Sequence, residues 1–437
     1  MENSQVFDAY RKALEGKSFY CKSGKVTQVI GLTMQVEGIK GFVGEVCIVE
    51  IDENQHVLAE VVGFKNDKVL LMPLGELSGI GPGCKVKPTG KSLRIKVGEN
   101  LLGKVLDGLG EPFDKENLYR ESEVDIYRSP PNPLKRKRIE KPMCTGVKAI
   151  DGLLTCGEGQ RLGIFSGSGV GKSTLLGKIS KFSNADVNVI ALIGERNREL
   201  LNVLDKDLGE DGMKKSVVVC ATSDQPALVR IKGAFTATAI AEYFRDKGLK
   251  VMFMMDSVTR FAMAQREVGL AIVEPPTTKG YTPSVFALLP KLLERSGTSD
   301  KGSITAFYSV LVDGDDMNEP ISDAVRGILD GHIVLSRKLA AKNHFPAIDV
   351  QRSISRLMKQ IVDKEHYELA GKIRDSLAVY EKSEDLINVG AYVKGSNPKV
   401  DEAVSIHERL MDFLKQEADD SCSLEATLES MKTLYGI

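Results

Sequence analysis

One octapeptide constrains the fold of this chain more than any other feature. Residues 166–173 read SGSGVGKS, directly after the apolar run 162–165 and before a segment of helical character. A strand, a glycine-rich turn and a helix in this order form a phosphate-binding loop, because the glycines let backbone N–H groups turn toward phosphate oxygens. Lys172 supplies a mobile positive charge for the β and γ phosphates, and the Ser173 hydroxyl suits Mg²⁺. The motif predicts that the chain binds a nucleoside triphosphate.

The loop departs from the usual pattern at one position. Ser166 stands where a glycine is usual, but Gly167 and Gly169 keep the loop flexible. The alternative is a glycine-rich turn with an incidental lysine, and the coincidence of strand, loop and helix disfavours it. The residues that we expect to hold the nucleotide are Gly167, Ser168, Gly169, Val170, Gly171, Lys172, Ser173 and Thr174.

Composition narrows the class of protein. The chain has 437 residues, 42% of them hydrophobic, which predicts two or three domains with well-filled cores. Lys and Arg (59) balance Asp and Glu (60), so no overall field attracts nucleic acid or an anionic membrane. Seven cysteines without a C-x-x-C pair favour free thiols in a reducing compartment. No apolar signal segment or bilayer-length stretch is present, so we expect a cytoplasmic protein whose membrane contact is at most peripheral.

Patterning divides the chain into four parts. Residues 1–18 predict a short amphipathic helix, which either covers the neighbouring barrel or docks a partner. Residues 19–97 contain short β-rich runs, the last at 93–97, separated by turn residues, as in a small closed β-barrel. In residues 98–358 apolar β-type runs alternate with helical patterns, which predicts an α/β domain with a largely parallel sheet. Residues 359–437 predict a small helical domain.

Two smaller features lie outside the central motif. A basic run, 135–138, follows the proline-rich connector 129–133, and it either grips nucleic acid or forms a solvated linker. In the last domain, apolar stripes at helical spacing predict two helices, and Asn397 with Pro398 suits the N-terminus of the second. The five histidines form no H-x-x-x-H pair, so no protein-ligated zinc site is expected.

Hydrolysis of a triphosphate requires a carboxylate that orients Mg²⁺ and a group that positions water. Asp256 ends a buried strand run, where it can hold a Mg²⁺-bound water beside Ser173. Glu195 follows the strand run 187–193, one helix and one strand after Lys172. Because strand ends converge on one edge of a parallel sheet, Glu195 can lie at the γ-phosphate and polarise the attacking water.

The charged run continues beyond Glu195. Arg196 can contact phosphate oxygens, and Glu199 can reach the water shell of the metal. Without the preceding strand such a run would be read as the solvated start of a helix. For Asp256 the alternative is an acidic strand end or a helix cap, which the phosphate-binding loop upstream disfavours. Placed after a strand of this sheet, both become candidates for catalysis and metal binding.

Longer motifs extend the pattern. One set of motifs is GERNRE at 194–199, DSVTRFA at 256–262, GYTPS at 280–284 and DDMNEP at 315–320, and a second set is RGILDGHI at 326–333 and GAYVKG at 390–395. By the first set the chain resembles the rotary-ATPase and secretion-ATPase group, and by the second the flagellum-specific type III protein-export ATPases within it, over nearly the whole chain.

The resemblance implies a RecA-like core and Mg²⁺-dependent ATP hydrolysis by a homohexamer with active sites between subunits. Arg356, in SISR at 353–356, is similar to the arginine that reaches into the adjacent subunit's site, a role that raises rates by about three to five orders of magnitude; a structural ion pair is the alternative. Phe345 resembles the residue that packs on adenine, with core packing as the alternative. Arg260 either senses the γ-phosphate or ties the strand end in an ion pair.

The resemblance also implies partners. These are a stator-like negative regulator at the N-terminal helix, a central stalk-like export protein, export gate membrane proteins and substrate–chaperone complexes, at the inner face of the cytoplasmic membrane. No nucleic acid is expected. One departure concerns Val273, which stands where the family commonly has glycine and bears on loop flexibility at a subunit contact.

Other functions share parts of this pattern. A catalytic subunit of a rotary proton-ATPase shares the active site but needs an alternating partner chain, and a virulence-type secretion ATPase shares nearly everything. A non-catalytic nucleotide-binding subunit would lack the glutamate that Glu195 provides. A hexameric RNA translocase needs aromatic residues beside basic ones on a single-strand-binding surface, and the barrel region offers few such pairs.

Overall fold

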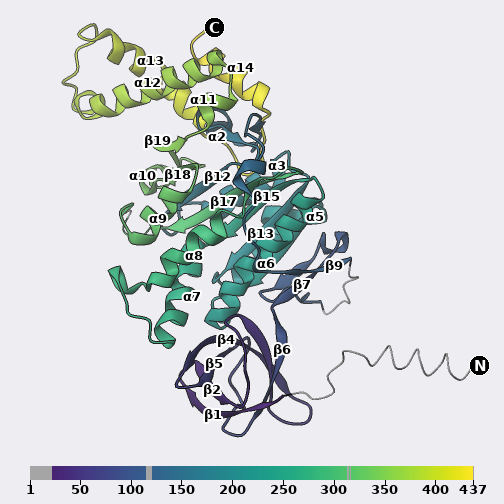
Figure 1. The fold of residues 1–437 in the computed structure, drawn as a ribbon. Coiled ribbons are helices and arrows are strands. Elements are labelled where there is room, and N and C mark those ends of the chain that lie inside the picture. Colours follow the sequence, from purple (N-terminus) through teal and green to yellow (C-terminus); the bar gives the residue numbers. More distant parts are fainter. Residues whose placement is uncertain (1–21, 115–120, 313, 315, 437) are drawn as a thin grey trace, which may run out of the picture. The chain divides into compact units, whose positions relative to one another are not determined.

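A computed structural model of the chain describes residues 22–114, 121–312, 314 and 316–436 (Figure 1). The helix expected at 1–18 lies outside the described residues. The chain forms two compact units that divide between Leu93 and Arg94. Among the helices of the described ranges, none is long and apolar enough to cross a membrane.

The first unit is a closed antiparallel barrel of six strands, in the order β1-β2-β5-β4-β3-β6. Alternate residues of these strands, such as Met34, Val36 and Leu71, are completely buried in its interior. The closed barrel predicted from the sequence is therefore confirmed. Its strands are β1 Gly24–Ile30, β2 Thr33–Glu37, β3 Glu45–Glu50, β4 His56–Lys65, β5 Lys68–Pro73 and β6 Lys85–Ser92.

The strand that closes the barrel differs from the expected one. β6 pairs with both β1 and β3, although its sequence is polar and contains Pro88. The run 93–97 was wrongly assigned to the barrel: it forms β7 (Arg94–Val97), which pairs with β9 (Ser122–Asp125) in the second unit. A β-rich run indicates that a strand forms, but its pairing partner depends on distant parts of the chain.

The second unit is built on a sheet of nine strands. The order is β19-β18-β12-β17-β15-β13-β14-β8, with β16 beside β17, and only β19 and β16 run antiparallel to their neighbours. The runs 162–165 and 187–193 and the run that ends at Asp256, all predicted as strands, form β12, β13 and β15. The strands are β8 Val105–Asp107, β12 Arg161–Ser166, β13 Val187–Ile193, β14 Ser216–Ala221, β15 Lys250–Asp256, β16 Gly297–Thr298, β17 Ser303–Leu311, β18 Gly331–Leu335 and β19 Ile348–Ser355.

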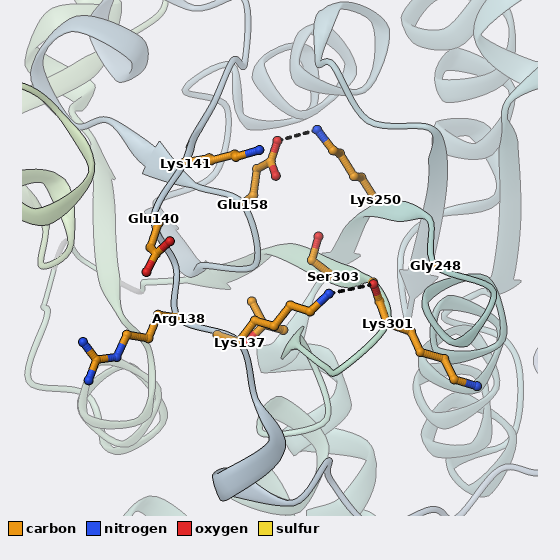
Figure 2. A pocket seen from close by; sticks show the side chains of 11 residues that line it. Lys137, Arg138, Glu140, Lys141, Glu158, Gly248, Lys250, Lys301 and Ser303 are labelled. Atoms are coloured by element: carbon orange, nitrogen blue, oxygen red, sulfur yellow. Dashed lines mark hydrogen bonds and ion pairs between the residues drawn. The ribbon is translucent and has the colours of Figure 1, made fainter.

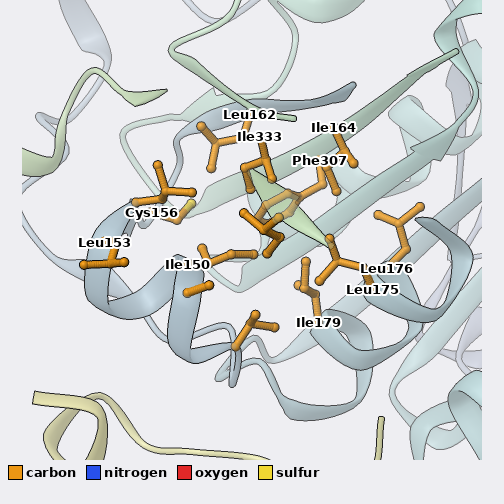
Figure 3. Close-up of a cluster of buried hydrophobic side chains, with 14 of the residues drawn as sticks. Ile150, Leu153, Cys156, Leu162, Ile164, Leu175, Leu176, Ile179, Phe307 and Ile333 are labelled. Carbon is orange, nitrogen blue, oxygen red and sulfur yellow. The ribbon is translucent and has the colours of Figure 1, made fainter. Parts of the chain in front are cut away.

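Helices cover this sheet, so that its central strands are buried from end to end. α6 packs on β13, β14 and β15, while α3 and α2 contribute to the core cluster drawn in Figure 3, together with β12, β17 and β18. The helices are α2 Lys148–Leu153, α3 Lys172–Phe182, α4 Asn197–Asn202, α5 Gly209–Lys214, α6 Ala227–Asp246, α7 Val258–Ala271, α8 Pro283–Leu293, α9 Pro320–Ile328 and α10 Arg337–Ala341, with a π-helical turn at Val203–Leu208.

The last helices are α11 (Met358–Ile361), α12 (Lys364–Asn388), α13 (Pro398–Leu414) and α14 (Leu424–Leu434). The predicted cap of α13 is confirmed, because the Asn397 side chain accepts a hydrogen bond from the backbone N–H of Lys399 at 3.1 Å. The buried stripes of α12 and α13 join the same core cluster as α2, so the helical segment belongs to the second compact unit rather than forming its own.

Candidate active site

The octapeptide 166–173 joins β12 to α3 at the carboxyl edge of the sheet. Gly169 and Gly171 have φ angles of 79° and 85°, a left-handed conformation that favours glycine. A Cβ at Gly167 would lie 2.4 Å from the guanidinium of Arg337, so a side chain there would collide. α3 begins at Lys172, and its first backbone N–H groups therefore face the loop with the positive end of the helix dipole. This is an anion-binding geometry.

Lys172 and Asp256 meet although they lie far apart in the sequence. The Lys172 ammonium donates to Asp256 Oδ1 at 2.5 Å, and both side chains are nearly buried, at 12% and 8% exposure. Ser309 on β17 donates to the same carboxylate oxygen at 2.5 Å and lies 3.5 Å from the lysine nitrogen. Sequence reasoning missed Ser309. Its signal was a hydroxyl near the carboxyl end of a predominantly apolar, buried strand.

Glu195 follows β13 at the same edge of the sheet and is 9% exposed. Its Oε1 atom has no hydrogen-bond partner among the described residues. Burial, reinforced by the nearby Asp256 carboxylate and opposed by Lys172, raises the pKa of Glu195 to about 7. A buried carboxylate with an unpaired oxygen is suited to accept a hydrogen bond from water.

Glu195 and Asp256 line one cavity of about 290 Å³. Its hydroxyl and carboxylate oxygens are ligands that Mg²⁺ prefers. The Glu195 oxygen that has no partner among the described residues can accept a hydrogen bond from the water shell of such an ion. Within the described ranges no group of three or more His, Cys, Asp or Glu side chains forms a cage for a metal. The lining residues are Ser173, Leu192, Glu195, Arg198, Glu199, Asn202, Val203, Asp207 and Asp256.

A second cavity of about 510 Å³ lies on the other side of the loop, a size that accommodates a nucleoside. Phe345 lines it and is 41% exposed, so its ring is a cavity wall and not part of the core. A Cβ at Gly171 would lie 3.4 Å from this ring, which places the aromatic face against the phosphate-binding loop. Thr174 and Lys178 of α3 line the same cavity.

The structure places two other predicted residues differently. Arg196 is exposed at the start of α4 and does not line the cavity of Glu195, whereas its neighbour Arg198 does. Arg260 packs over Gly194, since a Cβ there would lie 2.8 Å from the Arg260 Cβ. The Nε atom of Arg260 is buried without a partner among the described residues, and it makes no ion pair with them.

Arg356 lies at the amino ends of the parallel strands, whereas the octapeptide 166–173 lies at their carboxyl ends. It directly follows β19, and Ser355 pairs with Gly331, the first residue of β18. Since β18 runs parallel to β12, Arg356 is separated from the octapeptide by the length of β12, roughly 17 Å at the usual rise of a strand. Its exposed guanidinium donates to the carbonyl oxygen of Arg326 at 3.2 Å and forms no ion pair within the described part of the chain.

The basic run 135–138 is split by the fold. The Arg136 guanidinium donates hydrogen bonds to the carbonyl oxygens of Ser296 and Glu294, which fix this side chain within the second unit. Lys137 and Arg138 line a cavity of about 500 Å³ at the amino edge of the sheet, where Lys250 pairs with Glu158 (Figure 2). Lys135, Lys137 and Arg138 are exposed, as expected of a solvated linker, whereas Arg136 is held by its hydrogen bonds.

Comparison with known proteins decides the family. Residues 146–355 match the nucleotide-binding domain of the ATP synthase alpha/beta family, residues 26–90 its beta-barrel domain, and residues 362–433 the C-terminal domain of the type III secretion ATPase EscN. The chain is 57% identical to the flagellum-specific ATP synthase of Bacillus subtilis over 426 residues, 97% of each chain. It belongs to the flagellar and type III secretion ATPases.

Solved structures of such ATPases agree with this membership. The assembled ATPase EscN of the enteropathogenic E. coli type III secretion system is 47% identical, with a TM-score of 0.90 over 94% of this chain and 99% of that one. EscN in complex with its central stalk EscO has a TM-score of 0.88 with the same identity and coverage. As a flagellar and type III secretion ATPase, the chain is an ATP-hydrolysing enzyme with a RecA-like core.

Proposed function

We propose that this chain hydrolyses ATP to drive type III export of flagellar proteins, in a homohexameric ring with active sites between neighbouring copies. Its likeness to the Bacillus subtilis flagellum-specific ATP synthase supports the flagellar assignment, and EscN is solved as an assembled ATPase. One observation supports a site that is shared between copies: the octapeptide 166–173 lies at the carboxyl ends of the parallel strands and Arg356 at their amino ends. A single copy therefore cannot complete its own site.

The cavity around Glu195 suggests how the chain acts on the γ-phosphate. Lys172, now paired with Asp256, would turn to the phosphate oxygens when ATP enters. Bound Mg²⁺ would neutralise charge on the β and γ phosphates, held by Ser173 and, through water, by Asp256 and Glu199. Glu195 in its ionised form accepts a hydrogen bond from the attacking water and orients it in line.

Three more groups complete the proposed site. Arg198, which lines the cavity, replaces Arg196 as the nearby arginine best placed toward phosphate oxygens. Arg356 of the adjacent copy would stabilise the charge that develops during transfer of the phosphoryl group. Phe345 packs against the adenine and holds the base on the far side of the loop.

Mixing two inactive variants tests the shared site. Lys172→Ala and Arg356→Ala should each abolish turnover alone. In mixed rings about a quarter of the sites combine an intact Lys172 with an intact Arg356 from the neighbour, so activity should reappear. A mixture of Lys172→Ala with Glu195→Gln is the matched control, because both defects fall in the same half-site and no complete site forms. A first mixture as inactive as the control would refute the proposal.

Further partners follow from the same assignment. We propose a stalk-like protein as one partner, supported by the complex of EscN with its central stalk EscO. A stator-like regulator at residues 1–18, export gate proteins and substrate–chaperone complexes, at the inner face of the cytoplasmic membrane, complete the proposed setting. Co-purification from the native cell would identify these partners, and recovery of proton-ATPase subunits instead would refute the assignment.

A further inference from the structure

We propose that Ser309 is a positioning residue, which keeps the Asp256 carboxylate oriented after the nucleotide has drawn Lys172 away. This inference rests on the roles proposed above for Lys172 and Asp256. It concerns a residue that the sequence motifs do not include.

The sheet places Ser309 between the two motif strands. β17 pairs with β12 on one side, where Ser309 is in register with Ile164, and with β15 on the other, where Tyr308 is in register with Met255. The Ser309 side chain is completely buried, and its hydroxyl has one described acceptor, the Asp256 carboxylate. A short side chain on the central strand of a packed sheet cannot move with the phosphates.

The bonding of Asp256 makes this hydroxyl important. Asp256 Oδ1 accepts from two side-chain donors, the Lys172 ammonium and the Ser309 hydroxyl, each at 2.5 Å. Binding of ATP requires the ammonium at the phosphates, which removes the charged donor from a carboxylate that is 8% exposed. A buried carboxylate without a donor is strongly disfavoured. Ser309 stays, occupies Oδ1 and leaves Oδ2 free to accept from the water shell of Mg²⁺.

The alternative is that Ser309 merely fills space in the strand. In that case alanine, which removes one oxygen from a packed position, would alter stability slightly and leave metal-dependent binding unchanged. The two explanations therefore differ in a binding measurement that does not depend on turnover.

The experiment is calorimetry with a non-hydrolysable ATP analogue, with and without Mg²⁺. For Ser309→Ala we expect affinity without Mg²⁺ to fall as well, because Asp256 then loses both donors, and the gain on adding Mg²⁺ to fall about tenfold, the scale at which residues behind a metal ligand act. Ser309→Cys, close to serine in volume but a weak donor, should show the same loss. Ser309→Thr retains the hydroxyl and should restore the gain.

A control variant and two possible outcomes test whether Ser309 orients the Asp256 carboxylate. Thr305→Val removes another buried hydroxyl from β17, one that accepts from Gly159 N–H at 2.8 Å, and should lower stability alone. An unchanged Mg²⁺ gain in both the alanine and cysteine variants, or a threonine variant as impaired as alanine, overturns the inference. If Asp256→Asn also leaves the gain unchanged, the proposed role of Asp256 fails instead, so the two failures are distinguishable.

Discussion

Replacing Glu195 by glutamine should make the protein more stable while abolishing its activity. The carboxylate is buried, and its pKa is raised from 4.5 to about 7, first by burial and then by Asp256. A tenfold change in a protonation equilibrium corresponds to about 1.4 kcal/mol, so ionised Glu195 costs the fold about 3 kcal/mol. Glutamine has the same shape without the charge, and it removes this cost.

The sign of the pH dependence follows from linkage. Between pH 4.5 and about 7 the folded chain binds more protons at Glu195 than the unfolded chain, so the contribution of this group to stability falls as the pH rises. Above about pH 7 the loss is complete. Glu195→Gln should therefore gain little at pH 5 and up to about 3 kcal/mol at pH 8.

Urea unfolding at pH 5 and pH 8, together with steady-state ATP hydrolysis, provides the assay. Glu210→Gln, an exposed carboxylate on α5, is the matched control and should change neither quantity. For the unaltered chain, turnover should fall about tenfold for each pH unit well below 7, because only the ionised carboxylate orients water. Equal stability of the glutamine variant and the parent at pH 8, or near-normal hydrolysis by the variant, would refute the reasoning.

Two further substitutions test other parts of the structure. Phe345→Ala should raise the KM for ATP about tenfold with little change in kcat, since the lost ring contact serves binding; a fall in kcat at constant KM would contradict this in steady-state kinetics. Val273 is 80% exposed with a φ of 66°, a conformation that is costly for a β-branched residue, so Val273→Gly should raise the free energy of unfolding by about 1 kcal/mol. Denaturant unfolding checks this, and a loss of stability would count against it.

Some strands of the fold could be predicted from the sequence, and others could not. Strands β13, β15 and β17 were predictable, because a strand buried on both faces is a predominantly apolar run. β6 was not, since a barrel strand needs only one apolar face and its proline weakened the signal. β7 was recognised as a strand but assigned to the wrong sheet, because pairing joins residues that are distant in the sequence.

The active site shows the same division. By itself the sequence determined the chemistry that is local: the phosphate-binding turn at 166–173 and carboxylates directly after buried strands. Tertiary structure decided which groups meet. The strand order β12-β17-β15 brings Ser309 to Asp256, and the antiparallel β19 carries Arg356 to the far edge. Periodicity and turn residues act over a few positions, whereas strand order and direction are set by the packing of the whole sheet.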